Sequence, residues 1–349
     1  MSRRPASRLV LLFTPILAAA LATSGCGGSS SASTDGAKPK ITIAYQKFPS
    51  GDLVVKHDKL LETALPGYTI EWKVFDSGAS INTAFVADAV DIAAIGSSPV
   101  ARGLSDPLNI PYKVAFVLDV AGANEALVAR NGSGVSTIAG LKGHRIATPF
   151  ASTSHYSLLA ALTAAGLTDK DVTLVDLQPQ DIVAAWKRGD IDAAYVWLPT
   201  LEELKQTGTV LVDSAAVAKD GKPTLDLGVV SDDLISKHPE VVDAWRKAET
   251  TALAQVREQP DTAAKAVAAE LSITEADAKS QLSQGIFLSP AEITSSTWLG
   301  SGGKPGDIVT NLLDAAQFLA DQKKIPSAPS RDAIAAAIYT KGLPDVLTK

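Results

Sequence analysis

Short apolar runs alternate with helical stretches along most of the chain. In the first part, the runs that predict strands are residues 41–45, 70–75, 92–95 and 114–118. The stretches between them that predict helices are residues 53–65, 80–89 and 99–104. Because strands alternate with helices, we expect a parallel, doubly wound α/β sheet.

The same alternation resumes after residue 127 and predicts a second unit of this kind. Its expected strands are residues 145–148, 172–175, 193–196 and 210–212, and its expected helices are residues 154–165 and 179–187. A shift of 101 positions aligns Ile81 with Ile182 and Asp91 with Asp192, which supports two similar lobes. Beyond residue 231 the pattern becomes mostly helical, as in residues 239–258 and 262–269.

Small hydroxyl residues gather in the loops that follow three predicted strands. These loops are FDSGAS (75–80), GSSP (96–99) and PFASTSHY (149–156), and each opens a helix. In open α/β sheets, ligands bind outside the carboxyl ends of the strands. A helix N-terminus offers unpaired N–H groups and a partial positive charge. Each loop alone fits an ordinary N-cap, but three at equivalent strand ends predict an anion site without Lys or Arg.

The N-terminus has the pattern of a bacterial lipoprotein. Three arginines precede the apolar run of residues 9–21, and Thr-Ser-Gly-Cys (23–26) follows it. We therefore expect a signal peptide over residues 1–25, lipidation of Cys26 and a flexible tether over residues 26–40. Cys26 is the one cysteine of the chain, so neither an internal disulfide nor a cysteine-based zinc site is expected. The expected location is extracytoplasmic, with the protein anchored to the cell membrane by its N-terminal lipid.

Charge and motif content favour a binding protein over an enzyme. The formal net charge is -6, and Lys and Arg form no basic stripe, so nucleic acid is not an expected partner. The chain has four histidines but no HExxH, GxSxG or phosphate-binding loop, so we expect no metal, no cofactor and no catalytic residues. Ser152 and His155 lie one helical turn apart, but the local sequence offers no acid to orient the imidazole.

Several ordered motifs resemble one family of transport proteins. They are FDSGASI (75–81), GSSP (96–99), NEALV (124–128), PFASTSHYSLLAAL (149–162), AAWKRGDIDAAYVWLP (184–199), KPTLDLGVV (222–230) and HPEVV (238–242). This set is similar to the taurine-binding proteins of ABC importers, within the family that binds taurine, aliphatic sulfonates and nitrate. The resemblance runs from about Ile41 to the end of the chain.

The resemblance implies the α/β type 2 periplasmic-binding-protein fold. In that fold, two doubly wound lobes are joined by two crossing segments and bury the ligand between them, and a helical C-terminal region follows. Lobe I would comprise residues 41–125 and 227–349, and lobe II residues 126–226. The lobes would hinge near residues 120–126 and 226–230. The protein would act as a monomer with a membrane permease as its partner.

The resemblance also implies a set of ligand-binding residues, which agrees with the loops described above. It consists of Gln46, Ser77, Gly78, Ser97, Ser98, Glu125, Ser152, Thr153, His155, Tyr156, Tyr195, Trp197 and Asp226. Hydroxyls and helix ends suit a sulfonate, whereas the carboxylates of Glu125 and Asp226 suit an ammonium, and Tyr195 and Trp197 offer aromatic faces to a cation.

Alternatives remain for single residues and for the function. Glu125 could form a surface salt bridge, His155 could only shape the pocket, and Trp197 could serve packing alone. The favoured function is the solute-binding subunit of an ABC importer that captures taurine. Another sulfonate or small anion is the alternative ligand, and an envelope enzyme on the same fold is a further alternative.

Overall fold

A computed structural model of the protein describes residues 38–343 and residue 347. The predicted signal peptide, Cys26 and residues 26–37 of the predicted tether lie outside the described residues. Among the residues described, no helix combines the length and the apolar character needed to cross a membrane.

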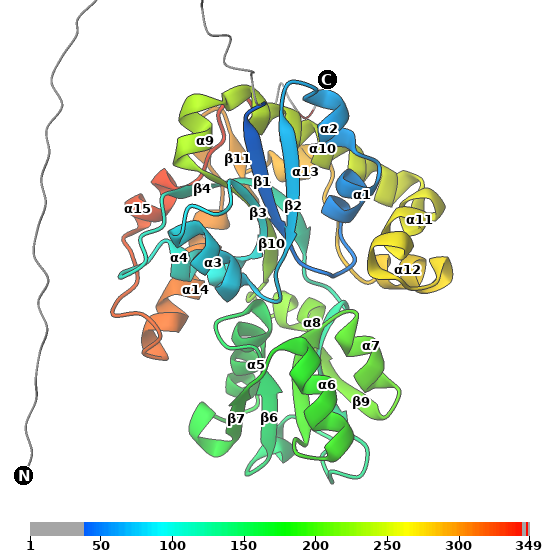
Figure 1. Cartoon of the computed structure of the whole chain (residues 1–349). Helices are drawn as coiled ribbons and strands as arrows, with labels where there is room; N and C mark the ends of the chain where they lie inside the picture. Colours follow the sequence, from blue (N-terminus) through cyan, green and yellow to red (C-terminus); the bar gives the residue numbers. More distant parts are fainter. Residues whose placement is uncertain (1–37, 344–346, 348–349) are drawn as a thin grey trace, which may run out of the picture. The chain divides into compact units, whose positions relative to one another are not determined.

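The described chain contains two five-stranded sheets (Figure 1). The first sheet has the order β2-β1-β3-β10-β4. Its strands are β1 (Lys40–Tyr45), β2 (Thr69–Val74), β3 (Ile92–Gly96), β4 (Tyr112–Val120) and β10 (Leu225–Ser231). β1 pairs in parallel with β2 and β3, whereas β10 runs antiparallel to both of its neighbours, β3 and β4.

Helices lie on both sides of the first sheet, with α3 and α4 on one side and α1 on the other, and α11 and α12 pack beyond α1 (Figure 1). These helices and the remaining elements outside the second sheet are α1 (Gly51–His57), α2 (Leu60–Ala64), α3 (Gly78–Val86), α4 (Ser97–Gly103), α9 (Asp232–Lys237), α10 (Pro239–Glu258), α11 (Pro260–Leu271), α12 (Glu275–Leu282), α13 (Pro290–Ile293), β11 (Gly300–Ser301), β12 (Lys304–Pro305), α14 (Ile308–Asp321) and α15 (Arg331–Ala336). The predicted helix over residues 53–65 is divided, because Lys59 adopts a left-handed backbone conformation with φ 54°.

The second sheet repeats this plan with the order β7-β6-β8-β5-β9. Its strands are β5 (Glu125–Arg130), β6 (Arg145–Thr148), β7 (Thr173–Asp176), β8 (Ala193–Trp197) and β9 (Gly208–Asp213). The helices that accompany it are η1 (Ala139–Leu141), α5 (Thr153–Ala164), η2 (Asp169–Asp171), α6 (Pro179–Arg188), α7 (Thr200–Lys205) and α8 (Ser214–Lys219). β5 is antiparallel to β8 and β9, as β10 is to its neighbours.

The structure confirms the eight predicted strands and corrects the prediction of purely parallel sheets. β5 and β10 were not predicted as strands, and both run against the neighbouring strands. Each enters its sheet directly from the other lobe, at the edge where the parallel strands end. A strand that begins at that edge must run in the opposite direction.

The two lobes are joined by two crossing segments that lie against each other. Residues 121–124 connect β4 with β5, and residues 220–224 connect α8 with β10. The backbone N–H of Ala121 donates to the carbonyl oxygen of Thr224 at 2.9 Å. The expected second hinge at residues 226–230 is wrong, because those residues form part of β10 in the middle of the first sheet.

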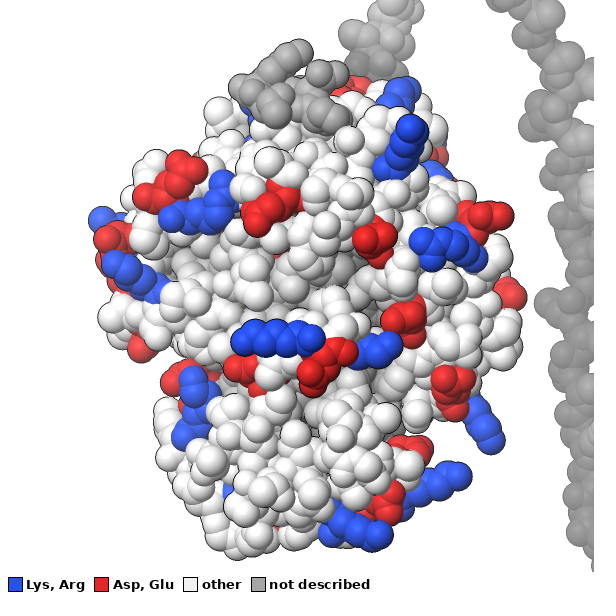
Figure 2. Space-filling view, turned by 180° about the vertical axis from the view of Figure 1, so that it is seen from behind, with Lys and Arg blue, Asp and Glu red and all other residues white. Residues whose placement is uncertain are grey.

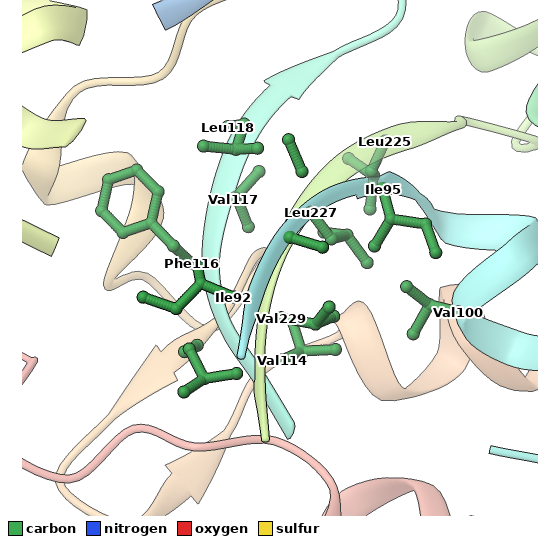
Figure 3. Close-up of a cluster of buried hydrophobic side chains, with 14 of the residues drawn as sticks. Ile92, Ile95, Val100, Val114, Phe116, Val117, Leu118, Leu225, Leu227 and Val229 are labelled. Carbon is green, nitrogen blue, oxygen red and sulfur yellow. The ribbon is translucent and has the colours of Figure 1, made fainter. Parts of the chain in front are cut away.

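Apolar side chains from β3, β4 and β10 form the centre of the first lobe (Figure 3). Ile92, Val117, Leu227 and Val229 are fully buried there. Burying side chains of this size stabilises the fold by about 1.5–3 kcal/mol each. Because β10 supplies part of this core, the inserted strand also anchors one end of the second crossing.

On the face of the molecule shown in Figure 2, Lys and Arg side chains are interspersed with Asp and Glu. Ion pairs join the two signs elsewhere in the described residues as well as across neighbouring elements, such as Lys222 with Asp314 at 3.0 Å. A surface with both signs interspersed does not concentrate one sign of electrostatic potential on a single patch.

Candidate ligand-binding site

A pocket lies where the strand ends of both sheets meet the crossing segments. The residues that line it are Gln46, Phe48, Pro49, Gly78, Gly96, Pro99, Ala121, Asn124, Glu125, Ser152, Thr153, Trp197, Leu198 and Asp226. Both lobes therefore contribute to it, as does the crossing segment of residues 121–124.

Just over half of the residues predicted for the site line this pocket. They are Gln46, Gly78, Glu125, Ser152, Thr153, Trp197 and Asp226. The lining residues that sequence reasoning missed are Phe48, Pro49, Gly96, Pro99, Ala121, Asn124 and Leu198. Most of these residues closely follow predicted strands. Their position in the sequence, and not the chemistry of their side chains, could therefore have identified them.

Three of the predicted serines near α3 and α4 do not line the pocket: Ser77, Ser97 and Ser98. The Ser97 hydroxyl oxygen accepts from the backbone N–H of Leu225 at 3.3 Å and so ties α4 to β10. The Ser98 hydroxyl is buried without a hydrogen-bond partner in the described structure. Ser77 is the N-cap of α3, and its neighbour Gly78 is the residue that reaches the lining.

The predicted aromatic and histidine side chains of the second lobe also lie outside the lining. Tyr195 is fully buried, and its hydroxyl lies 3.0 Å from the Ser214 hydroxyl. His155 and Tyr156 pack against Phe318 of α14, with ring centroids 6.0 and 4.9 Å apart. Burial lowers the pKa of His155 to about 4. The His155 ring therefore helps to pack the second lobe against α14.

Glu125, the first residue of β5, is the centre of a hydroxyl network. Its Oε2 accepts from Thr153 at 2.5 Å and from Ser154 at 2.8 Å. Its Oε1 accepts from Ser214 at 2.7 Å and from Thr224 at 3.4 Å. Burial raises the pKa of Glu125, and these four hydroxyls act in the opposite direction. A carboxylate has about four acceptor positions, so this network uses most of the capacity of Glu125.

Asp226, the second residue of β10, differs from Glu125 because no hydroxyl or N–H group in the described residues donates to its carboxyl group. It faces Asp119 of β4 across the strand pair. Burial, followed by the neighbouring Glu125 and Asp52 carboxyl groups, raises the pKa of Asp226 to about 7. Its Oδ1 lies 3.7 Å from the position that a Cβ at Gly96 would take. Asp226 is therefore the carboxyl group best able to accept from a ligand.

The N-termini of α3 and α5 bring backbone donors to the site. Gly78 and Thr153 are the first residues of these helices and line the pocket. The first N–H groups of a helix have no partner within it. The hydroxyls predicted as donors are engaged, since Ser152 donates to the Pro149 carbonyl at 2.6 Å and Thr153 donates to Glu125. The backbone N–H groups of Gly78 and Thr153 are thus donors available at the lining of the pocket.

Close packing of small residues brings the helix ends near the pocket. A Cβ at Gly78 would lie 2.4 Å from Cγ of Pro99. A Cβ at Gly96 would lie 2.8 Å from Cγ2 of Thr153, which belongs to the other lobe. Glycine at both positions leaves room for the side chains of Pro99 and Thr153 beside the site.

Comparisons with known proteins identify relatives of this chain. The family described as the substrate-binding domain of ABC-type glycine betaine transport systems matches residues 39–271. The taurine-binding periplasmic protein of Escherichia coli K12 is 39% identical over 293 residues, which cover 82% of this chain and 88% of that protein.

Two solved structures share the fold. The alkanesulfonate-binding protein SsuA of Xanthomonas axonopodis, bound to MOPS, aligns with a TM-score of 0.71 at 21% identity, covering 87% of this chain and 99% of that chain. The desulfurization enzyme DSZB aligns with a TM-score of 0.65 at 17% identity, covering 88% and 99%. The predicted two-lobed α/β fold is thereby confirmed, and it serves both binding and catalysis. By its sequence match and its fold, the chain belongs to the family of substrate-binding domains of ABC-type glycine betaine transport systems.

Proposed function

We propose that the protein is the lipid-anchored solute-binding subunit of an ABC importer, and that it captures taurine between its lobes for delivery to a membrane permease. The observation that carries this proposal is the Asp226 carboxyl group, which lines a pocket that also holds two helix N-termini. A zwitterion with a cationic and an anionic end matches such a pocket. The identity with a relative named for taurine supports the same ligand.

The cationic end of the ligand would meet Asp226. This carboxyl group has free acceptor positions, whereas Glu125 is engaged by four hydroxyls. Trp197, at the end of β8, adds an aromatic face to the lining, and such faces attract cations. In this arrangement Glu125 holds the helix ends and the crossing segment in place, and Asp226 contacts the amine.

The anionic end would meet the first turns of α3 and α5. Backbone N–H groups at Gly78 and Thr153 hold fixed positions, and the helix dipoles add partial positive charge. A sulfonate has three oxygens and can accept from donors in several directions at once. A planar carboxylate would leave one set of donors unpaired, which costs about 1–3 kcal/mol.

Calorimetry with three ligands tests both ends of the site. We expect wild-type protein to bind taurine at least about tenfold more tightly than β-alanine, its carboxylate analogue. Asp226→Asn should weaken taurine by about 2–5 kcal/mol and ethanesulfonate, which has no amine, much less. The exposed Asp233→Asn is the matched control and should change neither ligand. Equal losses for both ligands in Asp226→Asn would remove the amine contact from the proposal.

We also propose that this chain binds its ligand without chemical change, although an enzyme shares the fold. The Ser152 hydroxyl donates to a backbone carbonyl, and the His155 ring stacks on Phe150 at 4.6 Å between centroids. The Nδ1 atom of His155 accepts from the backbone N–H of Ala151. The pair is therefore arranged for packing, and taurine should be recovered intact after long incubation with the protein.

The anchor is a separate part of the proposal and rests on the sequence pattern around Cys26. Cys26→Ser removes the thiol to which the lipid would be attached. We expect the variant to leave the membrane fraction and to retain full taurine binding. Fractionation and mass spectrometry of the N-terminal peptide measure this, with the wild-type chain as the control. A variant that stays in the membrane fraction would refute the lipid anchor.

A further inference from the structure

Behind the pocket, the first lobe buries several carboxyl groups whose negative charge the surrounding residues do not neutralise. Asp119 of β4 is 0% exposed and Asp52 of α1 is 2% exposed. In the described structure, neither oxygen of either residue has a hydrogen-bond partner. Asp119 is the register partner of Asp226, the residue that lines the pocket.

The elements packed around this pair bring further acids. Asp52 comes from α1, Glu125 from β5 and Glu249 from α10, where Glu249 accepts from the indole N–H of Trp245 at 3.0 Å. The buried Arg246 of α10 does not compensate them, because its guanidinium donates to the carbonyls of Ala115, Tyr339 and Lys341. Several unpaired charges cannot be held so close together in a buried region, so some of these groups keep their protons.

Asp119 is the group best placed to stay protonated. Burial, followed by the charges of Asp226, Asp52 and Glu125, raises its pKa well above the ordinary value. Unlike Asp226, it does not line the pocket. Its carboxylic O–H can donate to the Asp226 carboxylate, and such hydrogen bonds to an ionised acceptor are among the strong ones.

We infer that Asp119 and Asp226 form a carboxyl pair that holds two protons in the empty pocket, and that the ammonium of the ligand displaces one of them. This inference rests on the proposed function. At acidic pH, both groups in the empty site are carboxylic acids. When the amine binds, Asp226 gives its proton to solvent and its carboxylate accepts from the ammonium. Asp119 keeps its proton and donates to Asp226, so that it acts as a positioning residue.

Such an exchange gives the amine a pH dependence that a plain sulfonate lacks. Below the pKa of Asp226, taurine must expel a proton, so its affinity falls about tenfold for each pH unit. Above that pKa the site is already ionised and the affinity levels off. Ethanesulfonate expels no proton, so acidification leaves its affinity unchanged or raises it.

Calorimetry at pH 6 in two buffers with different ionisation enthalpies counts the protons released. We expect close to one proton for taurine and none for ethanesulfonate with the wild-type protein. Taurine binding without proton release, at an affinity that stays flat between pH 5.5 and pH 8, would overturn the inference and leave the proposed function intact. Failure to bind taurine at any pH would instead overturn the proposed function.

Two substitutions at Asp119 test the positioning role. In Asp119→Asn the amide still donates to Asp226, so taurine affinity should stay within about threefold and proton release should persist. In Asp119→Leu the donor is lost, so the midpoint of the affinity–pH profile should move up by about one unit or more. Ethanesulfonate affinity should change in neither variant. If Asp119→Leu folds and keeps the wild-type profile, Asp119 has no positioning role. If it does not fold, Asp119→Asn decides, and loss of proton release there refutes the role.

Discussion

The buried carboxyl groups near the pocket also bear on stability. Burial is the largest cause that raises the pKa of Asp226 to about 7 and the pKa of Asp52 to about 6, from ordinary values near 3.8. Between pH 4 and pH 7, the folded protein therefore holds protons that the unfolded chain has released. Since the folded state binds more protons, the free energy of unfolding falls as pH rises through this window.

We accordingly expect the unliganded protein to melt at a higher temperature at pH 5 than at pH 8. Asp226→Asn carries no titrating group at this position, so its melting temperature should fall less over the same range. Each kcal/mol by which this titration lowers the free energy of unfolding corresponds to a fall of about 2–4 °C in the melting temperature. Scanning calorimetry of both proteins measures it. The same fall in both proteins would show that Asp226 does not titrate in this range.

At individual positions, the sequence predicts where a residue lies more reliably than which partner its side chain takes. The rule that ligands bind beyond strand ends singled out Gly78, Ser152 and Thr153, and these residues line one pocket. It could not reveal that the Thr153 hydroxyl donates to Glu125, because these residues are distant in the chain. It also missed Asp119, whose side chain lies within a buried strand and whose importance depends on Asp226 in the neighbouring strand.

Among the elements, the close approach of β3 to α5 joins the two lobes at the site. Gly96 has φ -65° and ψ 153°, values that any residue adopts. A side chain there would nevertheless meet Thr153 at the start of α5. The requirement for glycine is therefore steric, and it applies to the arrangement in which the lobes lie together.

Gly96→Val should thus weaken taurine and ethanesulfonate alike, by about tenfold or more, because it holds the lobes apart at the site. The melting temperature of the unliganded protein should change little, since the backbone at Gly96 is unstrained. Gly67→Val is the control, because a Cβ at Gly67 would have no neighbour within 4 Å. Calorimetry and thermal melts compare the two variants. Unchanged affinity in Gly96→Val would mean that Thr153 moves aside at no cost.

The elements that the sequence failed to predict share one physical cause. An alternating strand–helix pattern predicts parallel strands, each reached through a helix from the same lobe. The chain enters β5 and β10 from the other lobe. β5 begins with Glu125, and Asp226 is the second residue of β10, and both acids line the pocket. Their direction follows from long-range connectivity, which local periodicity does not contain.

Across the whole molecule, the lobes are held by more than the two crossings. Phe318 of α14 packs against Tyr156 of the second lobe, and Asn311 of the same helix donates to the carbonyl of Pro223 in the second crossing at 2.7 Å. The sequence predicted the helical nature of this region but not its contact with the second lobe. The apolar face of a helix indicates that the helix is buried, but it does not identify the lobe against which it packs.

The position of β10 between β3 and β4 sets an order for folding. All strands of the second sheet come from one continuous stretch of chain, which ends before β10 begins. The first sheet stays divided until Leu225–Ser231 inserts between strands formed far earlier in the sequence. Contacts so distant in the chain form slowly. We therefore expect the second lobe to fold first, and the first lobe to be completed in a later step that forms the pocket.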